Sequence, residues 1–324
     1  MDFKIITMKN SIAFLSLSLF LFTSCITKKQ PEKKPKLVVG IVIDQMRYDY
    51  LTRFADKYGE DGFKRILKGG FSLENAHYNY IPTYTAVGHA SIYTGTTPEN
   101  HGVIGNNWYD KYAKKYIYCV DDANFESIGA EKGGKKSPYR MQTTTITDQL
   151  RLAQNMQGKT ISVAIKDRSA VLPGGHTANG AYWFQGKKDG KWITSTFYME
   201  SLPKWVTNFN SSGKVDAYLS KPWNTLYDIN TYTESITDDN EFEVLFKGKD
   251  KPIFPYDIPS LKDKNGGYDI IKAIPAGNSI TTDFAKAAIL GENLGKSNHT
   301  DFLAISYSTP DYIGHQFGVA SKEV

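Results

Sequence analysis

The feature that most constrains this fold is a continuous apolar run near the start of the chain. It extends from Leu37 to Ile43 and ends at the carboxylate of Asp44. An uninterrupted run of this kind is typical of a parallel strand that is buried on both faces. In open α/β sheets, functional sites lie beyond the carboxyl ends of such strands. We therefore predict a buried parallel strand that places Asp44 at the functional edge of a sheet.

Patterns typical of helices and strands alternate through much of the remaining chain, which favours a parallel α/β sandwich. We expect helices at 47–58, 63–67, 145–155 and 279–294, strands at 160–165 and 301–306, and a loop at 309–311. The stretch 170–276 breaks this alternation, because its tryptophans stand among Gly, Lys and Asn. We predict that it forms a cap of short strands, loops and one helix at 202–209, inserted between catalytic segments 37–169 and 277–324.

The N-terminus has the pattern of an export signal. Lys4 and Lys9 precede an apolar run, 12–22, that is too short to span a bilayer comfortably and that closes on Cys25. We predict a lipoprotein-type signal peptide at 1–24, lipidation of Cys25 and a charged tether at 25–36. A cleaved secretory signal and an uncleaved anchor remain alternatives. The lipoprotein reading implies a periplasmic or outer-membrane-attached protein, with the lipid anchor as its only link to the membrane.

Composition excludes several classes of protein. The chain has 324 residues, of which 40% are hydrophobic and 23% are charged, as in an ordinary soluble globular protein. Its net charge of +5 is modest, and much of it lies in the tether, so we expect no nucleic-acid partner. Once Cys25 is lipidated, Cys119 is the remaining thiol, so no internal disulfide is expected and Cys119 is interpreted as a packed strand residue.

Thr85 is the candidate nucleophile. A loop that contains Pro82 leads into a predicted helix from about Ala86, which places Thr85 at the helix N-terminus. Free backbone N–H groups and the helix dipole favour an anion there. Thr85 could instead be an ordinary N-cap. A hydroxyl also needs a base or a metal before it is a good nucleophile at neutral pH.

Lys166 and Arg168 form a candidate binding pair. They end an apolar strand two residues apart, so we expect their side chains to project to the same side. Two cations on one side can meet the non-bridging oxygens of a dianionic phosphoryl group. Paired basic residues at a strand end can also be merely solvated.

Five segments together resemble the alkaline phosphatase superfamily, and most closely its PafA-type, phosphate-irrepressible bacterial members. The resemblance runs from about residue 36 to the end of the chain, and the motifs occur in the superfamily's order. The segments are Asp44, 82–89, 98–108, 166–168 and 311–315. The resemblance implies an alkaline-phosphatase-like α/β/α sandwich with a largely parallel central sheet.

The same resemblance implies a function and a set of roles. Asp44 would bind one Zn²⁺ together with the nucleophile Thr85, and Asp311 and His315 would bind a second Zn²⁺. Asn106 would donate a hydrogen bond to a phosphate oxygen. The implied reaction is hydrolysis of small phosphate monoesters by two-zinc catalysis through a phosphothreonine intermediate. His89, four residues after Thr85, is expected to have a structural role.

Two rival functions and one departure accompany this hypothesis. The related nucleotide pyrophosphatase/phosphodiesterases share the Thr and Asn motifs but lack the Lys-x-Arg feature, so the latter favours monoesters. The other rival is a non-catalytic lipoprotein that binds phosphate or glycans. The resemblance also implies an Asp-His pair and a further His after His315, whereas this chain ends at Val324. We therefore expect a C-terminally truncated copy that folds poorly or binds metal with reduced affinity.

Overall fold

The computed structural model describes residues 34–324. The predicted signal peptide, Cys25 and most of the predicted tether lie outside these described residues. The folded unit comprises Lys36–Val324. Of the helices between residues 34 and 324, none has the length and apolar character needed to cross a membrane.

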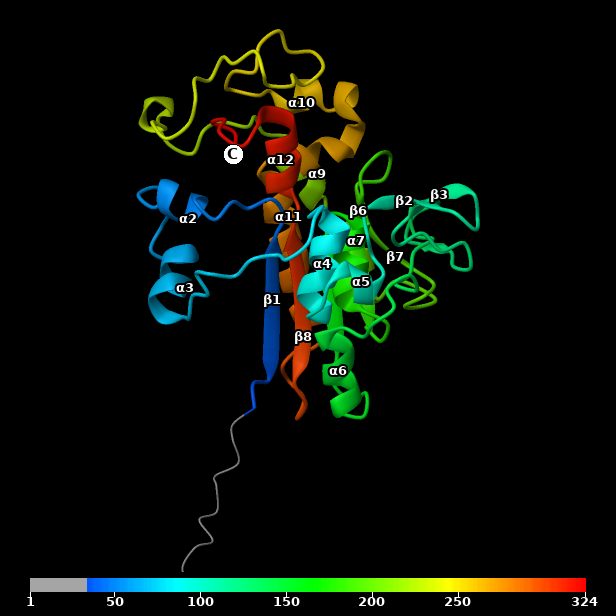
Figure 1. Ribbon diagram of the computed structural model, residues 1–324. Coiled ribbons are helices and arrows are strands. Elements are labelled where there is room, and N and C mark those ends of the chain that lie inside the picture. The colour runs from blue at the N-terminus through cyan, green and yellow to red at the C-terminus, as the bar shows by residue number, and fades with distance from the viewer. Residues whose placement is uncertain (1–33) are drawn as a thin grey trace, which may run out of the picture. The chain divides into compact units, whose positions relative to one another are not determined.

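A six-stranded sheet forms the centre of this unit (Figure 1), with the strand order β1-β8-β5-β6-β7-β4. The strands β1, β8, β5 and β6 run parallel, whereas β7 and β4 pair antiparallel to their neighbours. The strands are β1 (Leu37–Ile43), β4 (Ser127–Ile128), β5 (Thr160–Ala164), β6 (Gly180–Gln185), β7 (Lys191–Ser195) and β8 (Asp301–Tyr307). A separate antiparallel hairpin joins β2 (Asn107–Asp110) to β3 (Lys115–Tyr118). The prediction of a largely parallel α/β fold is confirmed.

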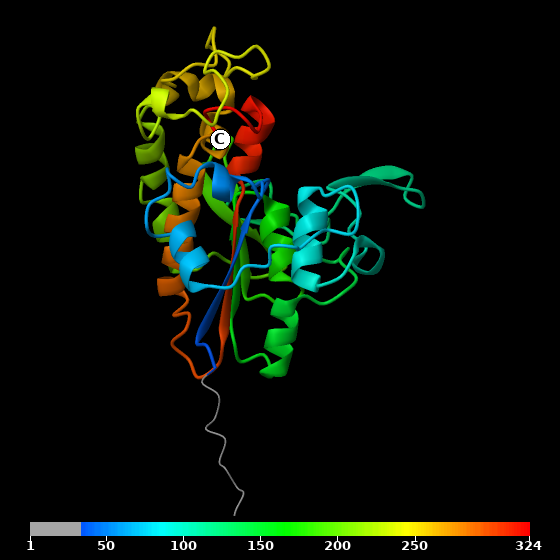
Figure 2. The same ribbon diagram turned by 60° about the vertical axis from the view of Figure 1, so that its left-hand side comes forward.

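Helices cover both faces of the sheet (Figure 2). One face carries α4 (Thr85–Thr94), α6 (Ile146–Ala153) and α7 (Asp167–Gly174), with α5 (Pro98–His101) packed on α4. The other carries α8 (Lys204–Asn210), α9 (Lys214–Leu219) and α11 (Ala276–Gly291). Shorter helices are α2 (Tyr50–Arg53), α3 (Phe63–Gly69) and α10 (Ile258–Leu261), and α12 (Thr309–Phe317) follows β8. The chain therefore forms the expected three-layer sandwich.

Aromatic side chains hold α11 to the sheet. The Trp192 ring on β7 stacks on Phe284 of α11 with centroids 4.2 Å apart, and both side chains are fully buried. Burying one such side chain stabilises a fold by about 1.5–3 kcal/mol. The aromatic residues of the 170–276 stretch thus contribute to the main core.

Several expectations differ from the structure. The predicted cap at 170–276 starts too early, because β6 and β7 belong to the central sheet. β1 is an edge strand, with Val39 and Ile41 about half exposed, so its burial on both faces was wrong. The helix predicted at 47–58 is much shorter in the structure, where α2 spans Tyr50–Arg53. The expected loop at 309–311 is the first turn of α12, where Pro310 is well suited to a helix start.

Other expectations hold. The helix near 145–155 is α6, which begins with a capping box between Thr145 and Asp148. The helix from Ala86 is present as α4, one residue earlier than expected. Cys119 is buried and free, as expected for a packed residue, but it lies in the turn after β3 and not in the strand. Burial raises the pKa of the Cys119 thiol to about 12, so it remains protonated at neutral pH.

A carboxyl group of the 170–276 stretch is buried without a partner. The Glu243 side chain has two carboxylate oxygens with no hydrogen-bond partner within residues 34–324. Burial, assisted by the nearby carboxyls of Glu323 and Asp238, raises the pKa of Glu243 to about 8. The folded protein therefore keeps a proton on Glu243 at pH values where an unfolded chain has released it.

This difference predicts a pH-dependent stability. Between the ordinary Glu pKa of 4.5 and about 8, the folded state binds more protons than the unfolded state, so the free energy of unfolding should fall as pH rises. Glu243→Gln should flatten this slope and be more stable than the parent at pH 8–9, as measured by urea denaturation. Glu241→Gln, on an exposed residue, is the matched control. Parallel pH profiles for parent and Glu243→Gln would contradict the assignment.

Candidate active site

The carboxyl ends of three neighbouring strands bring the central charges together. Asp44 directly follows β1, Lys166 follows β5 by two residues, and Asp311 lies in the first turn of α12 after β8. Lys166 Nζ donates a hydrogen bond of 2.6 Å to Asp44 Oδ2 and another to Asp311 Oδ2. The Lys166 side chain is only 1% exposed. A buried ammonium group thus joins two carboxylates that are 267 positions apart in the sequence.

Thr85 is the first residue of α4, and Tyr84 occupies the N-cap position. The Thr85 hydroxyl donates to Asp44 Oδ2 at 3.3 Å and accepts from Lys166 Nζ at 3.4 Å. Its alternative interpretation as an ordinary N-cap is therefore wrong. The hydroxyl lies between a carboxylate and an ammonium group, at the end of a helix that favours anions.

Asn106 and His89 support the start of α4. Asn106 Oδ1 accepts the backbone N–H of Ala86 at 2.9 Å, which satisfies one of the helix's free donors. His89 Nδ1 lies 2.8 Å from the Thr85 carbonyl oxygen, and its Nε2 lies 2.8 Å from Ser306 Oγ on β8. Burial lowers the pKa of His89, so the imidazole is neutral at pH 7. These contacts give His89 a structural role beside Thr85.

A cavity of about 680 Å³ opens at this edge of the sheet. All seven residues that the sequence predicts for catalysis, phosphate binding or metal binding line it: Asp44, Thr85, Asn106, Lys166, Arg168, Asp311 and His315. His315 is the most loosely held, because its side chain is 74% exposed and its Nε2 lies 3.4 Å from Asp311 Oδ1. The structure therefore brings the predicted residues together around one cavity.

Lys166 and Arg168 reach the cavity for a different reason from the one expected. The strand β5 ends at Ala164, Lys166 is the N-cap residue of α7, and Arg168 lies in its first turn. The alternation of side chains along a strand therefore does not apply to this pair. A strand-to-helix turn at the carboxyl edge of the sheet directs both side chains to the cavity.

Sequence reasoning missed the partners of Arg168. Arg168 Nη1 donates to Tyr118 Oη at 2.9 Å, and Tyr118 Oη donates to Asp167 Oδ1 at 2.5 Å. Burial lowers the pKa of Arg168, but Tyr118 and Asp167 outweigh this effect and hold it above its usual range. The position of Asp167 inside the Lys-Asp-Arg motif was a usable signal. Tyr118, 50 positions before Arg168, gave none.

The cavity offers donor atoms that suit a metal ion, although not a complete set. Asp44 with Thr85, and Asp311 with His315, supply carboxylate, hydroxyl and imidazole donors, which fit the preferences of Zn²⁺. Between residues 34 and 324, no group of three or more His, Cys, Asp or Glu side chains is arranged to hold a metal. The cation between the two carboxylates is Lys166 Nζ, which shows that this position favours positive charge.

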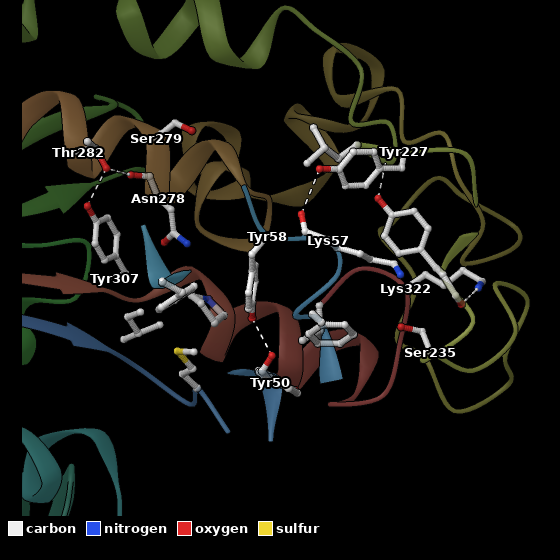
Figure 3. Close-up of a pocket in the computed structure, with 18 residues that line it drawn as sticks. Tyr50, Lys57, Tyr58, Tyr227, Ser235, Asn278, Ser279, Thr282, Tyr307 and Lys322 are labelled. Atoms are coloured by element: carbon white, nitrogen blue, oxygen red, sulfur yellow. Dashed lines mark hydrogen bonds between the residues drawn. The ribbon is translucent and has the colours of Figure 1, made fainter. Parts of the chain in front are cut away.

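A second cavity, of about 520 Å³, shares Ile43 and Met46 with the first but contains none of the predicted site residues. Figure 3 shows that its polar groups largely bond to one another. Tyr58 Oη donates to the Tyr50 carbonyl oxygen at 2.8 Å, and Tyr307 Oη lies 2.8 Å from Thr282 Oγ1. Its two lysines already have partners, because Lys57 pairs with Glu234 at 2.9 Å and Lys322 Nζ donates to the Tyr232 carbonyl oxygen at 2.9 Å. This largely apolar cavity is therefore less suited to a phosphoryl group than the first.

Comparisons with known proteins identify a family and several relatives. The family model described as type I phosphodiesterase / nucleotide pyrophosphatase matches residues 38–324. A relative from Myroides odoratus named calcium-transporting ATPase is 51% identical over 94% of this chain and 56% of its own length. Alkaline phosphatase PhoV of Synechococcus elongatus is 47% identical over 98% of this chain and 59% of its own length.

Solved structures extend the agreement to the fold. The crystal structure of wild-type alkaline phosphatase PafA matches with a TM-score of 0.88 and 46% identity, over 90% of this chain and 56% of that one. A PafA variant with a threonine, an asparagine, a lysine and an arginine replaced matches with a TM-score of 0.87 and 45% identity, over 90% of this chain and 57% of that one. The chain thus spans less than two thirds of the length of these relatives.

These matches confirm the alkaline-phosphatase-like fold and the resemblance to the PafA type. Because the family model covers nearly the whole folded unit, the chain belongs to the type I phosphodiesterase / nucleotide pyrophosphatase family, and within the proteins compared it is similar to bacterial alkaline phosphatases.

Proposed function

We propose that this protein hydrolyses phosphate monoesters and that Thr85 carries the phosphoryl group between the two steps of the reaction. The observation that carries the proposal is the position of the Thr85 hydroxyl, between Asp44 Oδ2 and Lys166 Nζ at the start of α4. The relatives named alkaline phosphatase support the same activity.

The geometry suits a double displacement at phosphorus. In the first step, Thr85 Oγ1 forms a bond to phosphorus while the bond to the alcohol oxygen breaks. The Thr85 proton, which Asp44 already accepts in a hydrogen bond, ends on the alcohol oxygen, and the neutral alcohol leaves. Lys166 and the α4 N-terminus stabilise the negative charge that develops. Water then attacks phosphorus, which releases inorganic phosphate and restores the Thr85 hydroxyl.

Three side chains are proposed to recognise the phosphoryl group. Lys166 and Arg168 would meet its non-bridging oxygens as a point charge and a planar fork, and Asn106 would donate a further hydrogen bond. The four residues replaced in the PafA variant share two spacings with Thr85 and these three side chains. Its threonine and asparagine lie 21 positions apart and its lysine and arginine two apart, as do Thr85 and Asn106, and Lys166 and Arg168.

Charge balance supports a metal cofactor. The charged side chains that line the cavity are Arg47, Lys166 and Arg168 against Asp44 and Asp311, which leaves one net positive charge, and Arg47 is itself paired with Asp49. A dianionic substrate therefore needs further positive charge. We propose two Zn²⁺ ions, one held by Asp44 and Thr85 and one by Asp311 and His315. When bound, such ions supply Lewis acidity and lower the pKa of a coordinated hydroxyl.

Export is the remaining part of the proposal. The Lys4 and Lys9 signal pattern and Cys25 support a lipoprotein in the periplasm or attached to the outer membrane, with the lipid as its only membrane contact. Its partners would be small phosphate monoesters, and no nucleic acid is proposed. Metabolic labelling with a fatty-acid analogue, compared between the parent and Cys25→Ser, tests this assignment.

A second candidate is hydrolysis of phosphodiesters, because the matching family model is described as a phosphodiesterase. A diester carries one negative charge fewer than a monoester dianion and therefore gains less from a second cation. The presence of both Lys166 and Arg168 in the cavity favours the monoester.

The nucleophile assignment predicts the behaviour of two substitutions. Thr85→Ala should lower kcat for a phosphate monoester by at least about a thousandfold, because the attacking oxygen is removed, whereas Thr85→Ser should retain measurable turnover. Thr94→Ala, at the far end of the same helix, should remain close to the parent. Turnover of Thr85→Ala near the parental rate would refute the assignment.

The substrate class is tested by comparing a monoester with a diester. Arg168→Ala should lower kcat/KM for the monoester by about a hundredfold, the usual effect of losing a donor to transition-state charge, and by far less for the diester. Lys166→Ala should lower kcat/KM for both substrates, because Lys166 also contacts Thr85. Steady-state kinetics of both substrates measures this. A parental preference for the diester would instead establish the second candidate.

Metal dependence gives a separate prediction. Dialysis against a chelator should abolish monoester hydrolysis, and Zn²⁺ should restore it better than Mg²⁺, because imidazole and carboxylate donors suit zinc. Bound zinc, measured by inductively coupled plasma mass spectrometry, should fall in Asp44→Ala and Asp311→Ala. Full turnover in the chelated, metal-free protein would contradict the zinc proposal.

A further inference from the structure

The guanidinium of Arg168 belongs to a hydrogen-bonded network of polar groups outside the cavity lining. Arg168 Nη1 donates to Tyr118 Oη at 2.9 Å, Tyr118 Oη donates to Asp167 Oδ1 at 2.5 Å, and Lys136 Nζ lies 3.1 Å from Asp167 Oδ2. The cavity is lined by Arg168 and not by the other three residues. Of these four residues, Arg168 alone lines the cavity.

Asp167 contacts Arg168 directly at the backbone and, through Tyr118, at the guanidinium. Its Oδ1 accepts the backbone N–H of Arg168 at 2.6 Å and also the hydroxyl of Tyr118, which contacts the guanidinium. The second oxygen of Asp167, Oδ2, pairs with Lys136 Nζ. Lys136 Nζ also donates to Asp121 and lies 4.6 Å from the centre of the Tyr118 ring. The network therefore runs from the Lys136 ammonium through the Asp167 carboxylate and the Tyr118 hydroxyl to the Arg168 guanidinium.

The direction of the Tyr118 hydroxyl bond matters. Burial raises the pKa of Tyr118 above its usual range, so the hydroxyl stays protonated and donates a hydrogen bond to Asp167. Its oxygen lone pairs then remain to accept from Arg168, because a hydroxyl has one proton and two acceptor positions. The carboxylate of Asp167 thus orients a hydroxyl that in turn orients the guanidinium.

We propose that Tyr118 and Asp167 are positioning residues for phosphate recognition: they fix the Arg168 guanidinium in the orientation that meets a dianionic phosphoryl group. The inference rests on the proposed function. An arginine that is free to rotate loses conformational entropy when it binds, whereas one held in advance loses less. The planar guanidinium also needs a defined orientation to bind two oxygens at once.

A purely structural role is the competing explanation, because Tyr118 at the end of the β2–β3 hairpin contacts α7 through the same bonds. The two explanations differ in their dependence on Arg168. A positioning residue acts through Arg168 and has no effect on recognition once the guanidinium is absent. A structural residue has the same effect in either case.

A double-mutant cycle separates them. Tyr118→Phe and Asp167→Asn are prepared in the full chain with Arg168 and with Arg168→Ala, and Tyr116→Phe, exposed on the same strand, is the control. The measurements are kcat/KM for a monoester and a diester and, independently of turnover, the affinity for inorganic phosphate by calorimetry. Thermal unfolding of each variant reports changes in stability.

We expect Tyr118→Phe and Asp167→Asn to lower monoester kcat/KM and phosphate affinity by about tenfold, the loss typical of a misplaced binding group, with little effect on the diester. In the Arg168→Ala background, neither substitution should cause a further loss. Tyr116→Phe should match the parent throughout.

Three results would overturn the inference. Equal losses in both backgrounds would establish a structural role. A strong effect of Arg168→Ala together with no effect of Tyr118→Phe or Asp167→Asn would reject the positioning role and leave the proposed function intact. No effect of Arg168→Ala on monoester turnover or phosphate affinity would reject the proposed recognition of phosphate, and the inference with it.

Discussion

The structure depends most on one buried cation between two carboxylates. Lys166 Nζ contacts Asp44 and Asp311, which are brought together by the ends of three adjacent parallel strands. Removing one member of a buried set of charges typically costs 3–5 kcal/mol, because an unpaired charge is left behind. The same contact determines the chemistry, since it places the Thr85 hydroxyl against both a carboxylate and an ammonium group.

Helix N-termini at one edge of the sheet explain why the cavity residues meet. Thr85 begins α4, Lys166 and Arg168 begin α7, and Asp311 begins α12, so three helix N-termini face one edge of the sheet. Each N-terminus offers backbone donors and a partial positive charge to an anion. In the proposed function, the fold itself thus supplies the general affinity for phosphate, and individual side chains such as Asn106 add to it.

The parts that the sequence predicted are those that depend on local pattern. The apolar runs of β1 and β5 and the helical pattern at 145–155 indicated their elements, and motif resemblance identified Asp44, Thr85 and Asp311. The parts it missed depend on contacts between distant segments. β1 is an edge strand because of the sheet order, the strands at 180–195 join the main sheet, and Tyr118 reaches Arg168 from a separate hairpin. No local periodicity records such pairings.

Thr85 is the residue that we propose accepts the phosphoryl group. The most direct test is to mix the protein with a phosphate monoester, quench the mixture in acid within milliseconds, and map the phosphorylated residue by peptide mass spectrometry. We expect a phosphoryl group on Thr85 that is absent without substrate and that decays as inorganic phosphate is released. Product formation with no phosphoryl group on Thr85 at any time, or with the group on another residue, would contradict it.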